Sequence, residues 1–274
     1  MDIITTKLHI GVEKPFRILH ISDTHLTYAD MRDGERKVTL SENRKIAFQH
    51  SEEVLSRVSE KASETGATII CTGDLIDFVS LANLERIAQF TEKNDCFMAA
   101  GNHEFSLYVG EAKEDADYRN QSLDKVQAVF KNDIRCSSRI IGGVNFVALD
   151  NGYYLFEEEQ LTFLQNEVKK GLPIILLMHT PLYEKNLYDR MLTIHPCAYL
   201  MDVPEEFMQH YPADRYEQQK ADEVTHKTVE YIRTQPLIRA AICGHIHFNY
   251  EGMAMERIPQ YTTSCTDIRL FEIT

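Results

Sequence analysis

Short apolar runs recur along the chain, and each is followed by a polar loop and then by an amphipathic stretch. The runs are bounded by turn-forming residues, and most are rich in Ile, Val or Phe. Runs of this kind are typical of buried β-strands. The predicted strands cover residues 16–21, 68–72, 96–100, 144–149, 174–178 and 240–243.

Helical spacing of apolar residues marks the stretches between these runs. Residues 43–65 carry Ile46, Val54, Leu55 and Val58 at near-helical spacing and stop at Gly66, a residue well suited to end a helix. Further helices are predicted over residues 84–93, 123–131, 157–170 and 221–234. Alternating strands and helices indicate an α/β protein. Gly142-Gly143 predicts a hairpin turn, so part of the sheet is expected to be antiparallel.

Residues 181–219 have a different character, because they mix Tyr, Met, His and Pro with only weak periodicity. A long irregular segment inside a compact domain is usually functional or disordered. The aromatic content of this segment favours an ordered lid over an active site. No repeat or linker divides the chain, so residues 1–274 are predicted to form one domain that carries this insert.

Charge limits the classes of partner. Acidic residues outnumber basic residues 42 to 29, which gives a formal net charge of −13. A negative field repels phosphate backbones and anionic membrane surfaces, so nonspecific nucleic-acid binding and membrane binding are not expected. Bound cations can reverse the sign of the electrostatic potential at a site, so the net charge is compatible with a small phosphorylated substrate.

Cysteine usage and the N-terminus bear on the cellular compartment. The six cysteines are scattered with no CxxC spacing, and neither a signal-peptide pattern nor a run of transmembrane length is present in the sequence. We expect reduced thiols in a cytoplasmic protein. The oligomeric state is left open.

Polar side chains able to bind metals follow five of the predicted strands. They are Asp23 and His25, Asp74 with Asp77 close behind, Asn102-His103-Glu104, His179, and His245 with His247. Residues two apart in an extended segment project to the same side, so Asp23 and His25 are expected to share a cation. The carboxyl ends of strands are where α/β sheets assemble their sites. Mixed imidazole, carboxylate and amide ligands suit Mn, Fe or Zn rather than Ca.

The order of these motifs resembles the calcineurin-like metallophosphoesterase superfamily, whose pattern is Asp-x-His, Gly-Asp-x-x-Asp, Gly-Asn-His-(Asp/Glu), His and Gly-His-x-His. The resemblance implies a four-layer α-β-β-α sandwich with two mixed central sheets and the site at the carboxyl ends of strands. It implies two divalent or trivalent transition-metal ions. One falls on Asp23, His25, Asp74 and His247, and the other on Asp74, Asn102, His179 and His245. His103, held by Asp77, would be the catalytic histidine.

The implied reaction is hydrolysis of a phosphoester bond by a metal-bridging hydroxide. Two metals about 3.5–4 Å apart clamp the attacking and leaving oxygens, and a bound metal lowers the pKa of water to about 7. His103 as imidazolium beside Asp77 can stabilise equatorial charge or protonate the departing oxygen. A small-molecule phosphodiesterase is slightly favoured over a phosphomonoesterase. A non-catalytic scaffold of the same fold and a DNA nuclease are the alternatives from other classes, and the acidic charge counts against the nuclease.

Three departures bear on the substrate. Phe78-Val79 stands where protein serine/threonine phosphatases of this superfamily carry Arg-Gly, which disfavours a protein substrate. Glu104 stands where small-molecule diesterases more often carry Asp, which weakens the diester interpretation. The insert at residues 181–219 follows the His179 motif and has no counterpart in the family's motifs, so the resemblance does not explain its effect on substrate specificity.

Substrate-binding residues remain unassigned from the sequence. Asn151 lies in a predicted turn beside the site and is a residue of interest. The residues able to stack on a substrate, or simply to pack locally, are Tyr153, Tyr154, Tyr183, Tyr188, Tyr199 and His195. Packing is the simpler expectation for any one of them. The acidic run at residues 157–159 is expected in the first turn of a helix, where negative charge is favourable.

Overall fold

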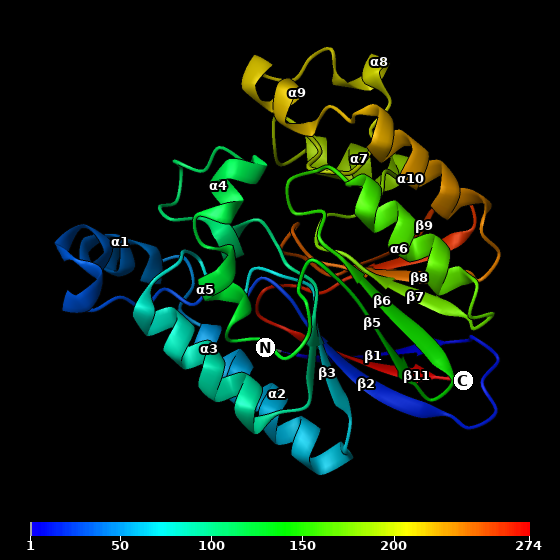
Figure 1. Ribbon diagram of the computed structural model, residues 1–274, viewed down its shortest axis with the longest axis horizontal. Helices are drawn as coiled ribbons and strands as arrows, with labels where there is room; N and C mark the ends of the chain where they lie inside the picture. The colour runs from blue at the N-terminus through cyan, green and yellow to red at the C-terminus, as the bar shows by residue number, and fades with distance from the viewer. Residues whose placement is uncertain (1) are drawn as a thin grey trace.

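Two β-sheets form the centre of the molecule in the computed structural model, which describes residues 2–274 (Figure 1). The first sheet has the order β1-β11-β2-β3-β4 and the second the order β5-β6-β7-β8-β10-β9. The first contains β1 (Ile3–Leu8), β2 (Phe16–Ile21), β3 (Thr68–Cys71), β4 (Cys96–Met98) and β11 (Ile268–Ile273). The second contains β5 (Cys136–Ile141), β6 (Val144–Leu149), β7 (Ile174–Leu177), β8 (Ile238–Cys243), β9 (Tyr250–Ala254) and β10 (Ile258–Thr262).

Helices cover the outer faces of both sheets (Figure 1). The described residues form the helices α1 (Glu35–Lys45), α2 (Ser51–Thr65), α3 (Leu81–Lys93), α4 (Ala116–Asn120), α5 (Leu123–Gln127), α6 (Glu158–Val168), α7 (Lys185–Leu192), α8 (Glu205–Met208), α9 (Ala213–Gln219) and α10 (Glu223–Thr234). Two short 3₁₀ helices, η1 (Met31–Asp33) and η2 (His103–Phe105), lie in loops. Helices α2 and α3 pack on the first sheet, and α6 and α10 pack on the second.

Three apolar cores between these layers confirm the four-layer α-β-β-α arrangement. Neighbouring residues of a strand point into different cores, as Ile69 and Ile70 of β3 show: Ile69 packs toward α2 and α3, whereas Ile70 packs between the two sheets. In β7, Leu176 faces α6 and α10 while Leu177 faces the first sheet. Strands buried on both faces need apolar residues at every position, which explains the continuous apolar runs.

Both sheets are mixed, as expected. Strands β2, β3 and β4 run parallel, and β11 pairs antiparallel with β2. Strands β6, β7 and β8 also run parallel, and β5 closes an antiparallel hairpin with β6 through Gly142 and Gly143, both with positive φ. Parallel strands place their carboxyl ends at one edge, so the loops after β2, β3 and β4 gather on one side.

The six predicted strands are confirmed, but three features of the prediction need correction. The helix predicted over residues 123–131 is shorter, because α5 ends at Gln127. Residues 43–65 do not form one helix, because α1 ends at Lys45 and α2 begins at Ser51. The hydroxyl of Ser51 donates to the carbonyl of Phe48, and the Phe48 ring stacks on His25, so tertiary contacts interrupt the helical periodicity. Strands β1, β9, β10 and β11 were not predicted; β1 and β11 pair with each other from opposite ends of the chain.

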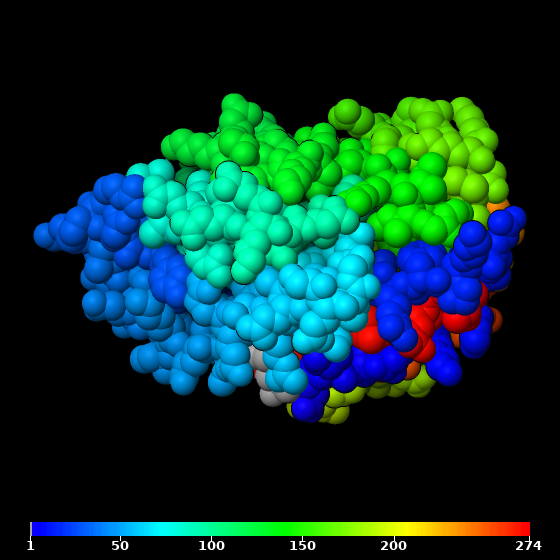
Figure 2. All heavy atoms as spheres, turned by 90° about the horizontal axis from the view of Figure 1, so that it is seen from below, coloured from blue at the N-terminus to red at the C-terminus, as the bar shows by residue number. Residues whose placement is uncertain are grey.

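The surface view in Figure 2 shows the consequence of this pairing: blue N-terminal and red C-terminal atoms lie side by side, next to the cyan atoms of the α2 region. Residues 181–219 fold into α7, α8 and α9, which share an apolar cluster that includes Leu187, Met191, Leu200 and Met208. Within residues 2–274, no helix combines the length and the apolar character that crossing a membrane requires.

Candidate metal centre

The residues predicted as metal ligands lie in loops at the carboxyl ends of strands from both sheets. The first sheet provides Asp23 and His25 after β2, Asp74 after β3 and Asn102 after β4; the second provides His179 after β7 and His245 and His247 after β8. Asp23, His25, Asp74 and His179 are buried. Every predicted ligand therefore lies at the junction of the two sheets, in loops at the carboxyl ends of their strands.

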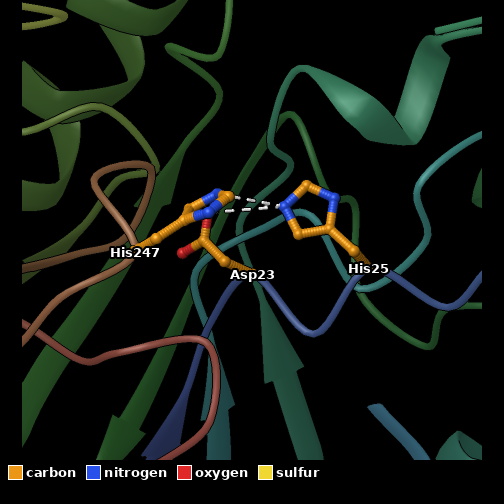
Figure 3. A group of neighbouring side chains, drawn as sticks. All are labelled: Asp23, His25 and His247. Carbon is orange, nitrogen blue, oxygen red and sulfur yellow. Dashed lines mark hydrogen bonds and ion pairs between the residues drawn. The ribbon is translucent and has the colours of Figure 1, made fainter. Parts of the chain in front are cut away.

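One group consists of Asp23, His25 and His247, whose ligand atoms all lie within 4.8 Å of one another. The Nε2 atom of His247 is 3.4 Å from Asp23 Oδ1 and 3.2 Å from Nε2 of His25. Figure 3 shows the three side chains facing one another, with Asp23 and His25 entering from the loop after β2 and His247 from the loop after β8. Two imidazoles and a carboxylate aimed at a common point form a donor set suited to a transition metal.

A second group consists of Asp74, His179 and His245. Nε2 of His179 lies 3.2 Å from Asp74 Oδ2 and 3.1 Å from Nδ1 of His245. The same Asp74 Oδ2 is 3.6 Å from His25 Nε2 of the first group. Asp74 therefore lies between the two groups, the position that a carboxylate shared by two cations would occupy.

Asn102 is the remaining predicted ligand, and its carbonyl oxygen supplies a test of the metal site. The side-chain Oδ1 of Asn102 is buried without a hydrogen-bond partner among residues 2–274. A buried polar atom without a partner is energetically unfavourable unless a ligand satisfies it. A Cβ atom added at Gly101 would lie 2.9 Å from His179 Cε1, so the backbone next to Asn102 runs against the second group. The residues therefore fit the two ions that the resemblance implies.

Hydrogen bonds on the outer side of the rings determine which nitrogen can bind a metal. Nδ1 of His179 lies 2.7 Å from the carbonyl oxygen of Thr72, and Nδ1 of His25 lies 3.0 Å from Asp77 Oδ1. Carbonyl and carboxylate oxygens accept, so each Nδ1 carries a proton and donates it. Nε2 is then the nitrogen of each ring that can bind a cation, and in both rings Nε2 faces Asp74.

The backbone of the ligand loops corrects one sequence expectation. Asp23 and His25 were expected in an extended segment, but their φ angles are 56° and 49°. His245 and His247 also have positive φ, at 71° and 56°. A non-glycine residue in this region is strained by on the order of 1–3 kcal/mol. Backbone bonds from Asp23 N to Gly73 O and from His25 N to Asp74 O hold the loop, at 3.0 and 2.9 Å.

Glycine is required where the loops after β3 and β4 approach each other. Gly73 has φ of 96°, and a Cβ atom there would lie 2.7 Å from Nδ1 of His179. Glu104 fastens these loops, because its carboxylate accepts the backbone N–H groups of Asp74, Leu75 and Gly101 at 2.7, 2.8 and 2.7 Å.

His103 and Asp77, the predicted catalytic pair, lie beside His25 of the first group: Asp77 accepts from His25 Nδ1, and the His103 ring meets the His25 ring edge-on. His25, Asp74 and His103 also lie close enough together to form a further group of possible ligands. Nδ1 of His103 donates to the carbonyl oxygen of Asp77 at 2.7 Å and lies 3.3 Å from its carboxylate. The His103 side chain is 20% exposed, while that of Asp77 is fully buried. Burial alone would lower the pKa of His103, but the carboxylates of Asp74 and Asp77 outweigh burial and raise it to about 9.

Sequence reasoning missed two residues that α1 and the following turn bring to the site. Arg44 donates to Asp77 through Nε at 2.6 Å and Nη2 at 2.9 Å, and Phe48 stacks on His25 with ring centres 4.2 Å apart. Burial opposes ionisation of Asp77, but the bonds from Arg44, His103 and His25 hold its pKa well below the usual range. No motif marks these residues, because their positions depend on where α1 ends.

Asn151, identified in the sequence as a residue of interest, holds the loop that carries His179. Its Oδ1 accepts the backbone N–H groups of His179 and Thr180 at 2.9 and 3.0 Å, and its Nδ2 donates to Thr180 O at 2.8 Å. Gly152 follows closely, and a Cβ atom there would lie 2.7 Å from Asn102 N. The turn after β6 is therefore part of the site's framework.

A cavity of about 480 Å³ opens above the metal groups. Its floor includes Asn102, His103, His245 and His247, and its two walls come from residues 106–114 and from the insert. The insert contributes Met191, His195, Tyr199, Arg215 and Gln218, and the side chains of Gln218 and Glu114 join the walls by a hydrogen bond. A second cavity of about 520 Å³, near Tyr183, Asp202 and Met253, is lined by none of the predicted ligands.

The aromatic residues considered in the sequence divide into two sets. Tyr154, Tyr199 and His195 line the cavity. Tyr183 and Tyr188 instead pack with Phe207 inside the insert, and Tyr153 packs edge-on against Phe105. The acidic run is also local structure, because Glu157 caps α6 and Glu158 and Glu159 lie in its first turn.

Comparisons with known proteins agree with this geometry. The sequence model of a family described as calcineurin-like phosphoesterase matches residues 16–249. No curated protein matches the sequence. Among solved structures, a dimetal phosphatase from Danio rerio is similar at 15% sequence identity and a TM-score of 0.50, with 92% of this chain and 88% of that chain covered.

Two further similar structures have larger chains. Haemophilus influenzae NAD nucleotidase has 13% identity and a TM-score of 0.45, with 92% of this chain and 45% of that chain covered. A 5'-nucleotidase from Candida albicans has 13% identity and a TM-score of 0.44, with 91% and 46% covered. At such identities a structural likeness concerns the fold alone, whereas the family match extends from β2 to the loop after His247. The chain therefore belongs to the calcineurin-like phosphoesterase family and is a metal-dependent phosphoric ester hydrolase.

Proposed function

We propose that this protein hydrolyses a phosphoester bond of a small-molecule substrate with two transition-metal ions, and that the bond is a phosphodiester. One observation carries the proposal: Asp74 belongs to one group of metal-binding side chains and lies 3.6 Å from His25 of the other, and His245 and His247 of the two groups line a cavity of about 480 Å³. Two groups far apart would each bind a single isolated ion. A carboxylate within reach of both groups instead favours two neighbouring ions that share it.

The proposed ligands follow the two groups. One ion would bind Asp23, His25, Asp74 and His247, and the other Asp74, Asn102, His179 and His245. The unpartnered oxygen of Asn102 and the inward-facing Nε2 atoms of His25 and His179 support this division. The donor set suits Mn, Fe or Zn. When bound, the two ions would supply positive charge and an activated water nucleophile.

His103 is proposed to hold the proton that the leaving oxygen receives. Its ring lines the cavity, and the contacts of its Nδ1 with the carbonyl and carboxylate oxygens of Asp77 favour the imidazolium form. Asp77 would keep the ring oriented through the carbonyl and carboxylate contacts to Nδ1. Arg44 would in turn fix the Asp77 carboxylate by its two donated bonds.

The cavity supports a small substrate. Residues 181–219 supply one wall, which supports the interpretation of this insert as a cover over the site within a single domain of 274 residues. Arg215 is the one Lys or Arg among the cavity-lining residues of the described chain. We therefore propose that its guanidinium contacts an anionic or hydrogen-bonding group of the substrate away from the metals.

The preference for a diester rests on position 78 and on the Gly-His-x-His motif. Phe78 is fully buried in place of the arginine of protein phosphatases, so its side chain serves the core rather than a phosphate. A phosphomonoesterase remains the alternative, since the same ligands support both reactions. The scattered free cysteines support the expectation of a reducing, cytoplasmic environment.

The proposal is tested by the rates on bis-p-nitrophenyl phosphate and p-nitrophenyl phosphate, with Mn²⁺ supplied after chelator treatment. Faster cleavage of the diester is expected. Faster cleavage of the monoester would make the protein a phosphatase. If the protein with Mn²⁺ bound hydrolyses neither of these substrates nor any of a wider panel of small phosphoesters, the result would favour a non-catalytic scaffold.

His103→Ala tests the proposed acid. It should lower kcat by about 10²–10⁴ and leave the metal content intact, because the imidazole donates a proton but is not proposed as a ligand. His50→Ala, which removes an exposed imidazole paired with Glu53, is the matched control and should retain full activity. Unchanged turnover in His103→Ala would exclude the assigned role.

A further inference from the structure

Tyr154 makes the closest side-chain contact to a predicted metal ligand from outside the motifs. Its hydroxyl lies 2.6 Å from Nε2 of His245, and its ring meets the imidazole edge-on with centres 5.4 Å apart. We propose that Tyr154 is a positioning residue that holds His245 with Nδ1 aimed at the second metal. The inference rests on the two-metal site of the proposed function.

The two nitrogens of His245 face different surroundings. Nδ1 lies 3.1 Å from Nε2 of His179 and belongs to the group formed with Asp74, whereas Nε2 points away toward Tyr154. A neutral imidazole that binds a cation through Nδ1 carries its proton on Nε2. That proton needs an acceptor, and the Tyr154 hydroxyl oxygen is at hydrogen-bond distance.

The other histidine ligands show the same arrangement with different acceptors. His179 donates its outer N–H to Thr72 O, and His25 donates its outer N–H to Asp77. Metal-binding histidines usually donate their second N–H to such a partner, which fixes both the tautomer and the ring orientation. Tyr154 completes this pattern for His245, with a hydroxyl in place of a carbonyl or carboxylate.

The surroundings of Tyr154 fix its hydroxyl in place. The side chain is 2% exposed and packs in the core between the second sheet and its helices, with Leu149, Phe156 and Met178. Its φ is 62°, an unfavourable angle for a tyrosine, and its backbone N–H donates to Asn151 O at 3.0 Å. The turn thus holds a strained backbone that directs the ring toward His245.

Tyr153 provides a matched control in the preceding position. It is also buried, at 4% exposure, but its hydroxyl has no hydrogen-bond partner within residues 2–274. Tyr153→Phe and Tyr154→Phe therefore remove the same atom from adjacent buried tyrosines, and only Tyr154→Phe removes a contact to a ligand.

The experiment measures Mn²⁺ binding to the full chain by isothermal titration calorimetry after chelator treatment, without substrate. Tyr154→Phe should weaken one of two Mn²⁺ sites by about 10–100-fold, the usual effect of losing such a partner. Tyr153→Phe should bind as the wild type does. Thermal unfolding of the metal-free proteins checks that both variants fold.

A double-mutant cycle separates positioning from general loosening of the site. In a His245→Ala background, Tyr154→Phe should have no further effect on Mn²⁺ affinity, because the ring that it orients is gone. Wild-type affinity in Tyr154→Phe, or an undiminished effect in His245→Ala, would overturn this inference and leave the proposed function standing. A wild-type chain that binds fewer than two Mn²⁺ would overturn both.

Discussion

Glu104 shows how a single buried carboxylate organises the site without facing the substrate. Both of its oxygens are occupied by the backbone N–H groups of Asp74, Leu75 and Gly101, and its side chain is fully buried. Burial and the charge of Asp74 raise its pKa to about 7 against the effect of the N–H donors. Glu104 therefore contributes to the loop geometry, so its identity says little about monoester or diester substrates.

Replacing this carboxylate by an amide should destabilise the fold. In Glu104→Gln one oxygen becomes an NH₂ group that faces backbone donors, and at least one buried N–H loses its acceptor. We expect a loss of about 1–3 kcal/mol in the free energy of unfolding. Urea denaturation measures it, with Glu64→Gln on the exposed side of α2 as the control. Equal stability of the two variants would contradict the fastening role.

The residues that gather at the candidate metal centre could be named from the sequence, but their backbone conformation could not. The motifs placed Asp23, His25, His245 and His247 correctly at strand ends, whereas the expectation of extended backbone was wrong. Positive φ at these residues is stabilised by contacts between loops that are distant in the chain, such as His25 N to Asp74 O. The pattern of residues along one sequence does not reveal contacts between loops that are distant in the chain.

At the scale of elements, the boundary between α1 and α2 determines what reaches Asp77. The apolar spacing of residues 43–65 continues through the boundary, so periodicity alone predicted one helix. The observed break after Lys45 places Arg44 against Asp77 and Phe48 against His25. Helix ends depend on tertiary contacts more than helix interiors do, and these two residues were missed for that reason.

Arg44→Gln should lower kcat by about 10-fold or more with both metals still bound. The reason is that Asp77, which contacts His25 and His103, loses the two bonds that fix its carboxylate. Steady-state kinetics on the preferred substrate, together with metal analysis, measures the effect. Lys45→Gln, the next residue on α1, is the control, and equal kcat values for the two variants would contradict the role of Arg44.

The insert is the element on which substrate preference should depend. Arg215→Gln in α9 should raise KM by about 10-fold or more and change kcat little, because a charged hydrogen-bond donor is lost from the wall while the metal ligands stay in place. Lys220→Gln, at the end of the same helix and paired with Glu205 on the surface, should leave KM unchanged. A fall in kcat at constant KM would assign Arg215 a different role.

At the scale of the whole molecule, the order of the motifs predicted the fold better than any local pattern. Alternating apolar runs indicated α/β structure, but nothing local assigned β2, β3 and β4 to one sheet and β6, β7 and β8 to the other. The pairing of β1 with β11 joins residues near the two ends of the chain, and the polar edge strand β9 lacks a clear apolar run. Only the resemblance to a family supplied the two-sheet arrangement.

Each proposed metal position joins the two sheets, so metal should stabilise the whole fold. Asp23 and His25 belong to the first sheet and His247 to the second, while Asp74 of the first sheet meets His179 and His245 of the second. Free Mn²⁺ at about 100 times its Kd should add about 2.7 kcal/mol per site. That stabilisation corresponds to a rise in Tm of about 5 °C or more.

Thermal unfolding of chelator-treated protein across a Mn²⁺ titration tests this link between the sheets. Asp74→Asn is the informative variant, because Asp74 lies between the two groups and a neutral amide weakens both positions at once. Its Tm should respond to Mn²⁺ much less than that of the wild type. An equal rise of Tm in both proteins would mean that the stabilising Mn²⁺ binds elsewhere on this acidic chain. The two sheets would then be held together by the apolar core around Ile70 and Phe146 alone.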